Sequence, residues 1–192
     1  MAISNLKKGL FIKEEDMAQK SVQVLMTLPP EERDSGVKEV LYKFCTESAE
    51  QFVQGEVQCQ GSPFADLPRA HFFNEMLLIN LWMIDKVFNK YKPELVAGIH
   101  QHYSGMPPDM PDRISGMARR FKTYHNEWDD YTGHQDLFGI KAGGLLFRSK
   151  NGYPVNEVSF RIISYSEESI AVLKKIRKAF REAKLIAAPD NA

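Results

Sequence analysis

The sequence is poor in cysteine: Cys45 and Cys59 are the only two in 192 residues, and they do not form a CxxC pair. A disulfide framework or a zinc knuckle needs more cysteines or a closer spacing, so we expect neither. Two reduced thiols are typical of cytoplasmic proteins. An excess of charge is also lacking, because 25 basic residues balance 25 acidic ones. Overall charge therefore does not favour a nucleic acid or an anionic lipid as the partner.

Long hydrophobic runs are absent as well. The start of the chain has a single apolar run of three residues, from Leu10 to Ile12, which is too short for the core of a signal peptide. The longest apolar stretch runs from Met76 to Ile84, is interrupted by Asn80, and is too short to span a bilayer. We therefore expect a cytoplasmic protein without a membrane span.

Catalytic motifs are missing too. The sequence contains no GxSxG elbow, and Gly143 and Gly144 precede three apolar residues instead of completing a phosphate-binding loop. Cys45 lies beside Phe44 in an amphipathic stretch, where an inert thiol is expected. Since no acid, base or nucleophile can be named, the sequence favours a non-enzymatic protein, and we assign no catalytic residue.

An apolar fraction of 43% and a charged fraction of 26% are those of a globular domain. We expect one helical domain over residues 1–192, with an extended arm at 1–13 and a frayed tail at 187–192. Hydrophobic periodicity predicts an all-α fold, a compact bundle of about six or seven helices around a central helix at 66–91. Asp66 is expected to cap that central helix.

Five further helices are expected around the central one. They cover residues 14–28, 34–54, 94–103, 112–131 and 167–186. Asp34 or Ser35 would cap the helix at 34–54, and Gly55 would end it. Ser166 would cap the last helix. The helix at 112–131 has the most regular amphipathic pattern, so we expect it to be the chief neighbour of the central helix.

Residues 135–163 carry two competing patterns. A helical turn is expected at 135–140, followed by a break at Gly143 and Gly144. Beyond the break, the apolar residues at 158, 160 and 162 alternate as in a strand, while those at 155, 158, 162 and 165 fit a helix. We favour the helix because the other elements are helical. The alternative is an α+β fold with one β-hairpin near 145–163.

The central helix carries residues that do not match their faces. Asn80 falls within its apolar arc, and burying an unpaired amide costs about 1–3 kcal/mol. We predict that Asn80 hydrogen-bonds across the core and fixes the helix register; the alternative is that it faces a cavity. Leu78 and Trp82 lie on the polar face. Trp82 should therefore be covered by another segment of the chain, a second copy or a partner.

Histidines and carboxylates provide a candidate metal site. His71 and Glu75 lie four residues apart on the central helix, and His125 and Asp129 repeat this spacing on the helix at 112–131. Two such pairs on neighbouring helices could hold a metal ion. The same spacing is common on solvated helix faces, and the Glu-x-x-His signature of di-iron bundles is absent.

Aromatic and methionine side chains could instead line a pocket for an apolar small ligand or a haem, although such a stripe is more often core. The candidate ligand-binding residues are Asn80, Trp82, His71, Glu75, His125 and Trp128, with His125 as the axial ligand of a haem. The sequence does not identify a cofactor.

The final helix is basic and carries Lys174, Lys175, Arg177, Lys178, Arg181 and Lys184. Acidic residues lie close by and no recognition-helix motif accompanies them, so nucleic-acid binding is not favoured. We expect a non-enzymatic cytoplasmic helical module that binds or regulates through protein–protein contacts, including a homodimer built on an apolar helix face. The alternative is a helical protein that holds an apolar ligand, a haem or a metal ion in its core.

Overall fold

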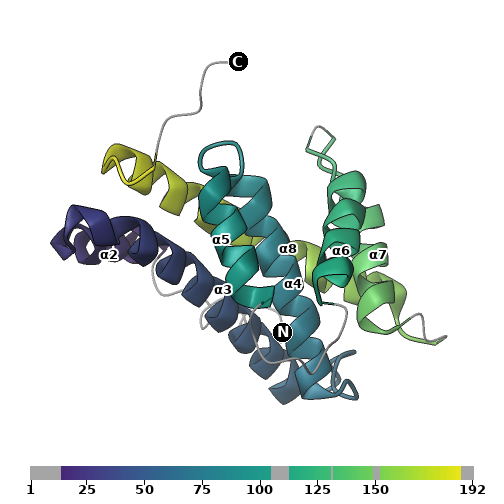
Figure 1. The fold of residues 1–192 in the computed structure, drawn as a ribbon. Helices are drawn as coiled ribbons and strands as arrows, with labels where there is room; N and C mark the ends of the chain where they lie inside the picture. The colour runs from purple at the N-terminus through teal and green to yellow at the C-terminus, as the bar shows by residue number, and fades with distance from the viewer. Residues whose placement is uncertain (1–13, 105–112, 131, 149–151, 187–192) are drawn as a thin grey trace.

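The computed structural model describes residues 14–104, 113–130, 132–148 and 152–186. Within them the chain forms seven α-helices and one 3-10 turn, packed into a bundle (Figure 1). The elements are α2 (Glu14–Thr27), η1 (Pro30–Glu32), α3 (Arg33–Gln58), α4 (Arg69–Phe88), α5 (Pro93–Ser104), α6 (Arg113–Glu127), α7 (Asp136–Leu146) and α8 (Val155–Glu182). The predicted all-α bundle is confirmed. The alternative β-hairpin near 145–163 is wrong, because residues 145 and 146 end α7 and residues 155–163 lie in α8.

The central helix of the bundle is α4, as the periodicity predicts. It contacts α3, α5, α6, α7 and α8 and runs through the middle of the bundle (Figure 1). Its chief neighbours are α3 and α8, so the prediction that the helix at 112–131 would be the main one is wrong. The reason is length: α3 and α8 have 26 and 28 residues and run along α4, whereas α6 has 15.

Helix ends differ from the prediction at α4 and α6. Pro68, not Asp66, precedes the first residue of α4, because residues 62–67 are already folded into successive turns. Helix α6 ends at Glu127, before the predicted end at residue 131. The chain turns there because Trp128 packs on Phe138 of α7, with ring centroids 4.9 Å apart. Tertiary packing of an aromatic side chain therefore ends this helix.

Helix α3 begins at Arg33 and continues past Gly55 to Gln58, so neither predicted end is correct. Glu32 precedes the helix, and no side-chain cap bond forms there. The last turn is stabilised by Glu56, which is almost fully buried and accepts two hydrogen bonds from Arg161 of α8, at 3.0 and 2.8 Å. This ion pair compensates for the weak helix propensity of Gly55.

Helix α7 also continues through the predicted break at Gly143 and Gly144. Gly139 and Gly143 face α8: a Cβ on Gly139 would lie 2.9 Å from Cβ of Ser159, and one on Gly143 would lie 2.9 Å from Cγ1 of Val158. Here glycine does not end the helix. It allows α7 and α8 to approach closely.

Helix α8 is continuous, so the predicted start of a last helix at Ser166 is wrong. Ser166 lies in the helix interior and is fully buried. No glycine or proline interrupts residues 155–182, and the apolar residues that seemed to form two short helices form one long stripe. The predicted arm at 1–13 and tail at 187–192 lie outside the described residues. No helix in the described part of the chain is long and apolar enough to cross a membrane.

Asn80 is bonded in the core, which confirms the prediction for this residue. Its side-chain amide donates to the carbonyl oxygen of Cys45 on α3 over 2.7 Å, and its Oδ1 accepts a hydrogen bond from the hydroxyl of Tyr165 on α8, also over 2.7 Å. Asn80 therefore joins the three longest described helices at one level. Cys45 and Cys59 are free thiols, as predicted.

Candidate binding surface at α6, α7 and α8

Trp82 of α4 is covered by the same chain. Its side chain is fully buried, and the centroid of its ring system lies 5.6 Å from that of Tyr124 on α6 and 5.0 Å from that of Phe138 on α7. Trp128, after the end of α6, completes this aromatic cluster at 5.3 Å from Trp82. The sequence left three possibilities for what covers Trp82: another segment of the chain, a second copy or a partner. In the structure, another segment of the same chain covers it.

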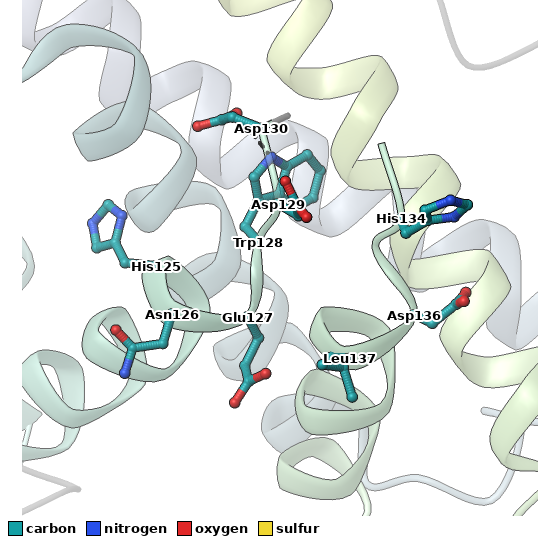
Figure 2. A pocket seen from close by; sticks show the side chains of 9 residues that line it. All are labelled: His125, Asn126, Glu127, Trp128, Asp129, Asp130, His134, Asp136 and Leu137. Carbon is teal, nitrogen blue, oxygen red and sulfur yellow. Dashed lines mark hydrogen bonds between the residues drawn. The ribbon is translucent and has the colours of Figure 1, made fainter. Parts of the chain in front are cut away.

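An open depression of about 650 Å³ lies beside this cluster, where α6 ends and α7 begins (Figure 2). It is lined by His125, Asn126, Glu127, Trp128, Asp129, Asp130, His134, Asp136 and Leu137. His125 and Trp128 both also contact Trp82, with ring centroids 5.9 and 5.3 Å away. Two residues that line the depression therefore pack against Trp82 of the aromatic cluster.

The depression is acidic. Its lining contains four carboxylates and neither lysine nor arginine. Glu127, at the end of α6, and Asp136, at the start of α7, have no hydrogen-bond or ion-pair partner within the described ranges (Figure 2). Asp136 also has a structural role, since a carboxylate in the first turn of a helix is favourable. Among the described residues, no basic side chain neutralises these two carboxylates.

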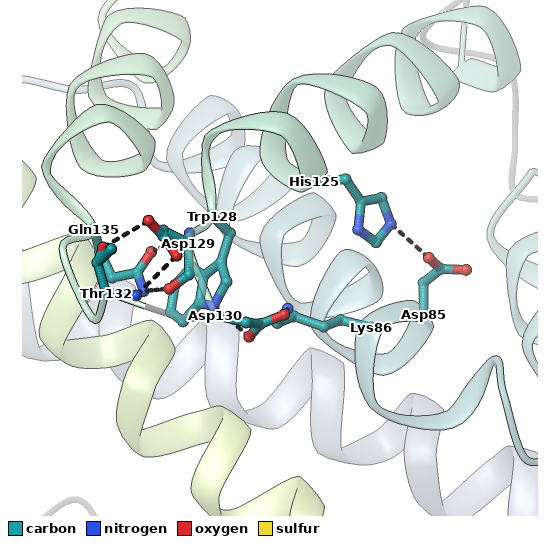
Figure 3. Close-up of polar contacts among 8 residues, drawn as sticks. All are labelled: Asp85, Lys86, His125, Trp128, Asp129, Asp130, Thr132 and Gln135. Carbon is teal, nitrogen blue, oxygen red and sulfur yellow. Dashed lines mark hydrogen bonds and ion pairs between the residues drawn. The ribbon is translucent and has the colours of Figure 1, made fainter.

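The segment that connects α6 to α7 is held by its own polar contacts (Figure 3). The carboxylate of Asp129 accepts two hydrogen bonds from Thr132, from its N–H over 3.0 Å and from its hydroxyl over 2.6 Å. The side chain of Gln135 closes the loop: it accepts from the N–H of Asp129 over 3.0 Å and donates to its carbonyl oxygen over 2.6 Å. The wall of the depression is consequently preorganised.

A lysine of the chain shows how this wall holds an ammonium group. Nζ of Lys86 on α4 lies 2.5 Å from Oδ2 of Asp130 and 5.8 Å from the ring centroid of Trp128 (Figure 3). The indole N–H of Trp128 donates to Oδ1 of the same carboxylate over 3.2 Å. A carboxylate and an aromatic face therefore act on one cation, which is the arrangement that binds lysine and arginine side chains in general.

His125 joins α6 to α4. Its Nε2 lies 2.7 Å from Oδ2 of Asp85, and the imidazole remains partly exposed at the edge of the depression (Figure 3). The nitrogen that points toward α4 is therefore engaged with a carboxylate. This contact orients the ring and leaves only its other nitrogen for an outside group.

The four predicted metal ligands do not come together. Nε2 of His71 lies 2.7 Å from the carbonyl oxygen of Leu146, at the end of α7. Glu75 forms a two-point ion pair with Arg120 of α6, at 2.7 and 3.1 Å. The other two predicted ligands lie at the depression. Among the described residues, no group of three or more His, Cys, Asp or Glu side chains is placed to hold a metal ion.

The six predicted ligand-binding residues separate into two sets. Trp82, His125 and Trp128 lie together at the depression. His71, Glu75 and Asn80 are bonded elsewhere, to α7, to α6, and to α3 and α8 respectively.

Sequence reasoning missed an apolar strip on the outer surface of α7 and α8, made of Leu137, Ile140 and Phe160. These side chains are 59%, 41% and 65% exposed. Gly139 packs against Ser159, and Ile140 and Phe160 each follow one of these two residues. In an antiparallel helix pair, the residues one step after a contact turn to the same side. Ile140 and Phe160 therefore emerge side by side, and Leu137 lies one turn from Ile140 on α7.

Buried groups near these helices are held neutral. Burial raises the pKa of the Cys45 thiol, so the thiol stays protonated and unreactive. Burial also raises the pKa of Tyr124, and the nearby charge of Glu75 raises it further while that of Arg120 lowers it. The hydroxyl of Tyr124 and the indole nitrogen of Trp82 are buried without a hydrogen-bond partner in the described part of the chain.

The basic end of α8 is partly occupied by contacts within the chain. Arg177 donates to the carbonyl oxygen of Val87 over 3.0 Å and lies 4.4 Å from the ring centroid of Tyr91. Arg181 lies over the same ring at 5.6 Å, and Lys178 pairs with Glu182 at 3.9 Å. These arginines pack the end of α8 against the segment after α4.

Comparisons of the chain with models of known protein families, with curated proteins and with solved structures find no match.

Proposed function

We propose that the protein is a non-enzymatic binding module that acts through protein–protein contacts, and that its binding surface is the strip of Leu137, Ile140 and Phe160 with the depression beside it. The observation that carries the proposal is the 65% exposure of Phe160, next to two further exposed apolar side chains on one side of a helix pair. Single exposed apolar residues are ordinary, but a contiguous set of them is typical of an interaction site.

The rigidity of the surface supports the proposal. Gly139 and Gly143 bring α7 into close contact with α8, and the loop before α7 is held by the bonds between Asp129 and Gln135. Such a surface loses little conformational entropy when a partner binds. The two free thiols fit the accompanying proposal of a cytoplasmic location.

A paired substitution tests this function. In Ile140→Ser/Phe160→Ser the strip becomes polar, whereas in the control Val24→Ser/Met26→Ser two similarly exposed apolar residues of α2 are changed, at 60% and 45% exposure. Each tagged protein is incubated with a cell extract of the organism to which the protein is native. The bound proteins are quantified by mass spectrometry. We expect a specific protein that the control retains and the strip variant loses. Identical sets of bound proteins for the two variants would contradict the proposal.

A second candidate function is the binding of a small apolar ligand inside the aromatic cluster. One observation favours it: the unpartnered indole nitrogen of Trp82 and hydroxyl of Tyr124 lie in neighbouring, fully buried rings. Such groups could hydrogen-bond a ligand that replaces part of the cluster. Absorption spectra and mass spectrometry of the denatured protein test this idea, and a preparation that releases neither a haem nor any small molecule contradicts it.

A further inference from the structure

We propose that the partner segment is basic and amphipathic: a lysine or arginine side chain of the partner enters the acidic depression while its apolar side chains cover the strip of Leu137, Ile140 and Phe160. This inference rests on the proposed protein-binding function and adds the chemistry of the partner. The segment belongs to a different protein.

The depression is complementary in charge to a basic side chain. The depression presents four carboxylates, and those of Glu127 and Asp136 have no partner among the described residues. They stand at the end of α6 and at the start of α7, on different sides of the depression, and their carboxylates point away from each other (Figure 2). Opposite charges on a partner would gain attraction here, and like charges would be repelled.

Lys86 of α4 contacts two lining residues of the depression. Its ammonium group is held between Asp130 and the face of Trp128. Trp128 and Asp130, both in the lining, therefore already bind one ammonium group of the chain. A second ammonium or guanidinium group would meet Glu127 at the end of α6 or Asp136 at the start of α7.

The depression and the strip are continuous. Leu137 lines the depression and is also the first residue of the strip. Ile140 follows one turn later on α7, and Phe160 lies beside it on α8. A ligand that fills the depression and extends beyond Leu137 therefore contacts the apolar strip. A segment with a basic residue and, one turn away, apolar residues matches this order.

Other ligand classes fit less well. A metal ion needs three or more converging ligands, and the described residues offer no such group. A nucleic acid would bring phosphates to a row of carboxylates, which repel it. A free polyamine would satisfy the carboxylates but would leave the strip exposed.

Designed peptides test the inference directly. The probe is a fourteen-residue peptide of leucine and lysine at helical spacing, and the matched control carries glutamate at every lysine position. Binding to the full chain is measured by isothermal titration calorimetry at low and at high salt. We expect the lysine peptide to bind at least about tenfold more tightly than the glutamate peptide, and its advantage to shrink at high salt because exposed charges are screened.

Protein variants locate the binding. Glu127→Gln/Asp136→Asn should weaken the lysine peptide by about three- to tenfold, the range expected for two exposed ion pairs. Glu31→Gln/Glu39→Gln, which removes two exposed carboxylates elsewhere, should leave its affinity unchanged. Circular dichroism and the unfolding midpoint confirm that all variants are folded.

Several outcomes would overturn the inference. A basic partner segment would be excluded by any of three results. These are equal binding of the two peptides, no binding of either peptide, and unchanged affinity of the lysine peptide for Glu127→Gln/Asp136→Asn. The proposed protein-binding function would then still be judged by the extract experiment with the strip variant. Full competition by spermine, without any effect of Ile140→Ser/Phe160→Ser, would identify a free polycation as the ligand. Self-association in sedimentation velocity that Glu127→Gln/Asp136→Asn abolishes would identify a second copy instead.

Discussion

The hydroxyl of Tyr165 on α8 lies 2.7 Å from Oδ1 of Asn80 on α4 and donates a hydrogen bond to it. The amide nitrogen of the same Asn80 donates to the carbonyl oxygen of Cys45 on α3. One buried amide therefore fixes the relative positions of α3, α4 and α8. Because α8 carries Phe160, this bond also helps to position the outer strip.

Replacing Asn80 with leucine should destabilise the protein. Asn80→Leu removes the hydrogen bonds from Tyr165 and to Cys45 and leaves the side chain of Ser169 as the remaining partner of the Tyr165 hydroxyl, and loss of buried hydrogen bonds costs about 1–3 kcal/mol. The free energy of unfolding in urea measures this loss. Tyr165→Phe and the double variant complete a cycle, in which we expect the two losses to be non-additive. A loss in Asn80→Leu smaller than about 0.5 kcal/mol would mean that the bond contributes little to stability.

Glycine-to-alanine substitutions should have opposite effects in α7 and α3. In Gly139→Ala the new Cβ would meet Cβ of Ser159 at 2.9 Å, and overpacking of this kind costs about 1–3 kcal/mol. In Gly55→Ala no atom lies within 4 Å of the new Cβ, so the better helix propensity of alanine should stabilise α3 by up to about 1 kcal/mol. Urea unfolding compares the two variants. Stabilisation in both would show that α7 and α8 are not in close contact.

The buried carboxylate of Glu56 should matter more than the exposed carboxylate of Glu157, although both pair with Arg161. Glu56→Gln removes the buried negative charge that pairs with Arg161 and leaves one amide oxygen in place of the two carboxylate oxygens that accept from Arg161 and Ser62, at a cost of about 3 kcal/mol. Glu157→Gln should cost less than about 1 kcal/mol. The difference between their unfolding midpoints tests this order, and equal losses would contradict it.

Stability should fall at alkaline pH. Burial raises the pKa of the thiol of Cys45 and of the phenols of Tyr124 and Tyr165, so the folded chain keeps protons that the unfolded chain releases. The stability from these groups is therefore fully present below their unfolded pKa values and is lost as pH rises above about 9. Each group can contribute up to about 1.4 kcal/mol per pH unit. Urea unfolding at pH 8, 9.5 and 10.5 measures the trend, and Tyr165→Phe should make it shallower. A flat profile over this range would contradict the burial of these groups.

Helical periodicity was sufficient to predict the all-α class and the central helix, because the apolar residues of α4 and α6 repeat at helical spacing. Helix ends were harder to predict, since long-range contacts determine them. The ion pair between Glu56 and Arg161 stabilises the turn of α3 that follows Gly55. The packing of Trp128 against Phe138 ends α6. Gly143 resembles a helix breaker in sequence and is a packing residue against Val158 in the structure.

The candidate site was predicted only in part, for a related reason. The dense aromatic pattern marked Trp82, His125 and Trp128, and these residues do lie together. The exposure of Phe160 could not be predicted, because it depends on which face of α8 the other helices leave uncovered. Leu137 and Ile140 lie one turn apart in sequence, and this spacing was the only local signal of the strip.

Photo-crosslinking from the strip is the most direct test of a protein-binding surface on α7 and α8. A benzoylphenylalanine in place of Phe160 is compared with the same group in place of Val24, which is about equally exposed on α2. After irradiation in cells, we expect a discrete adduct with one protein from position 160 and none from position 24. The yield of the adduct should fall when Glu127→Gln/Asp136→Asn is added. The same adducts from both positions, or none from position 160, would contradict the assignment of this surface.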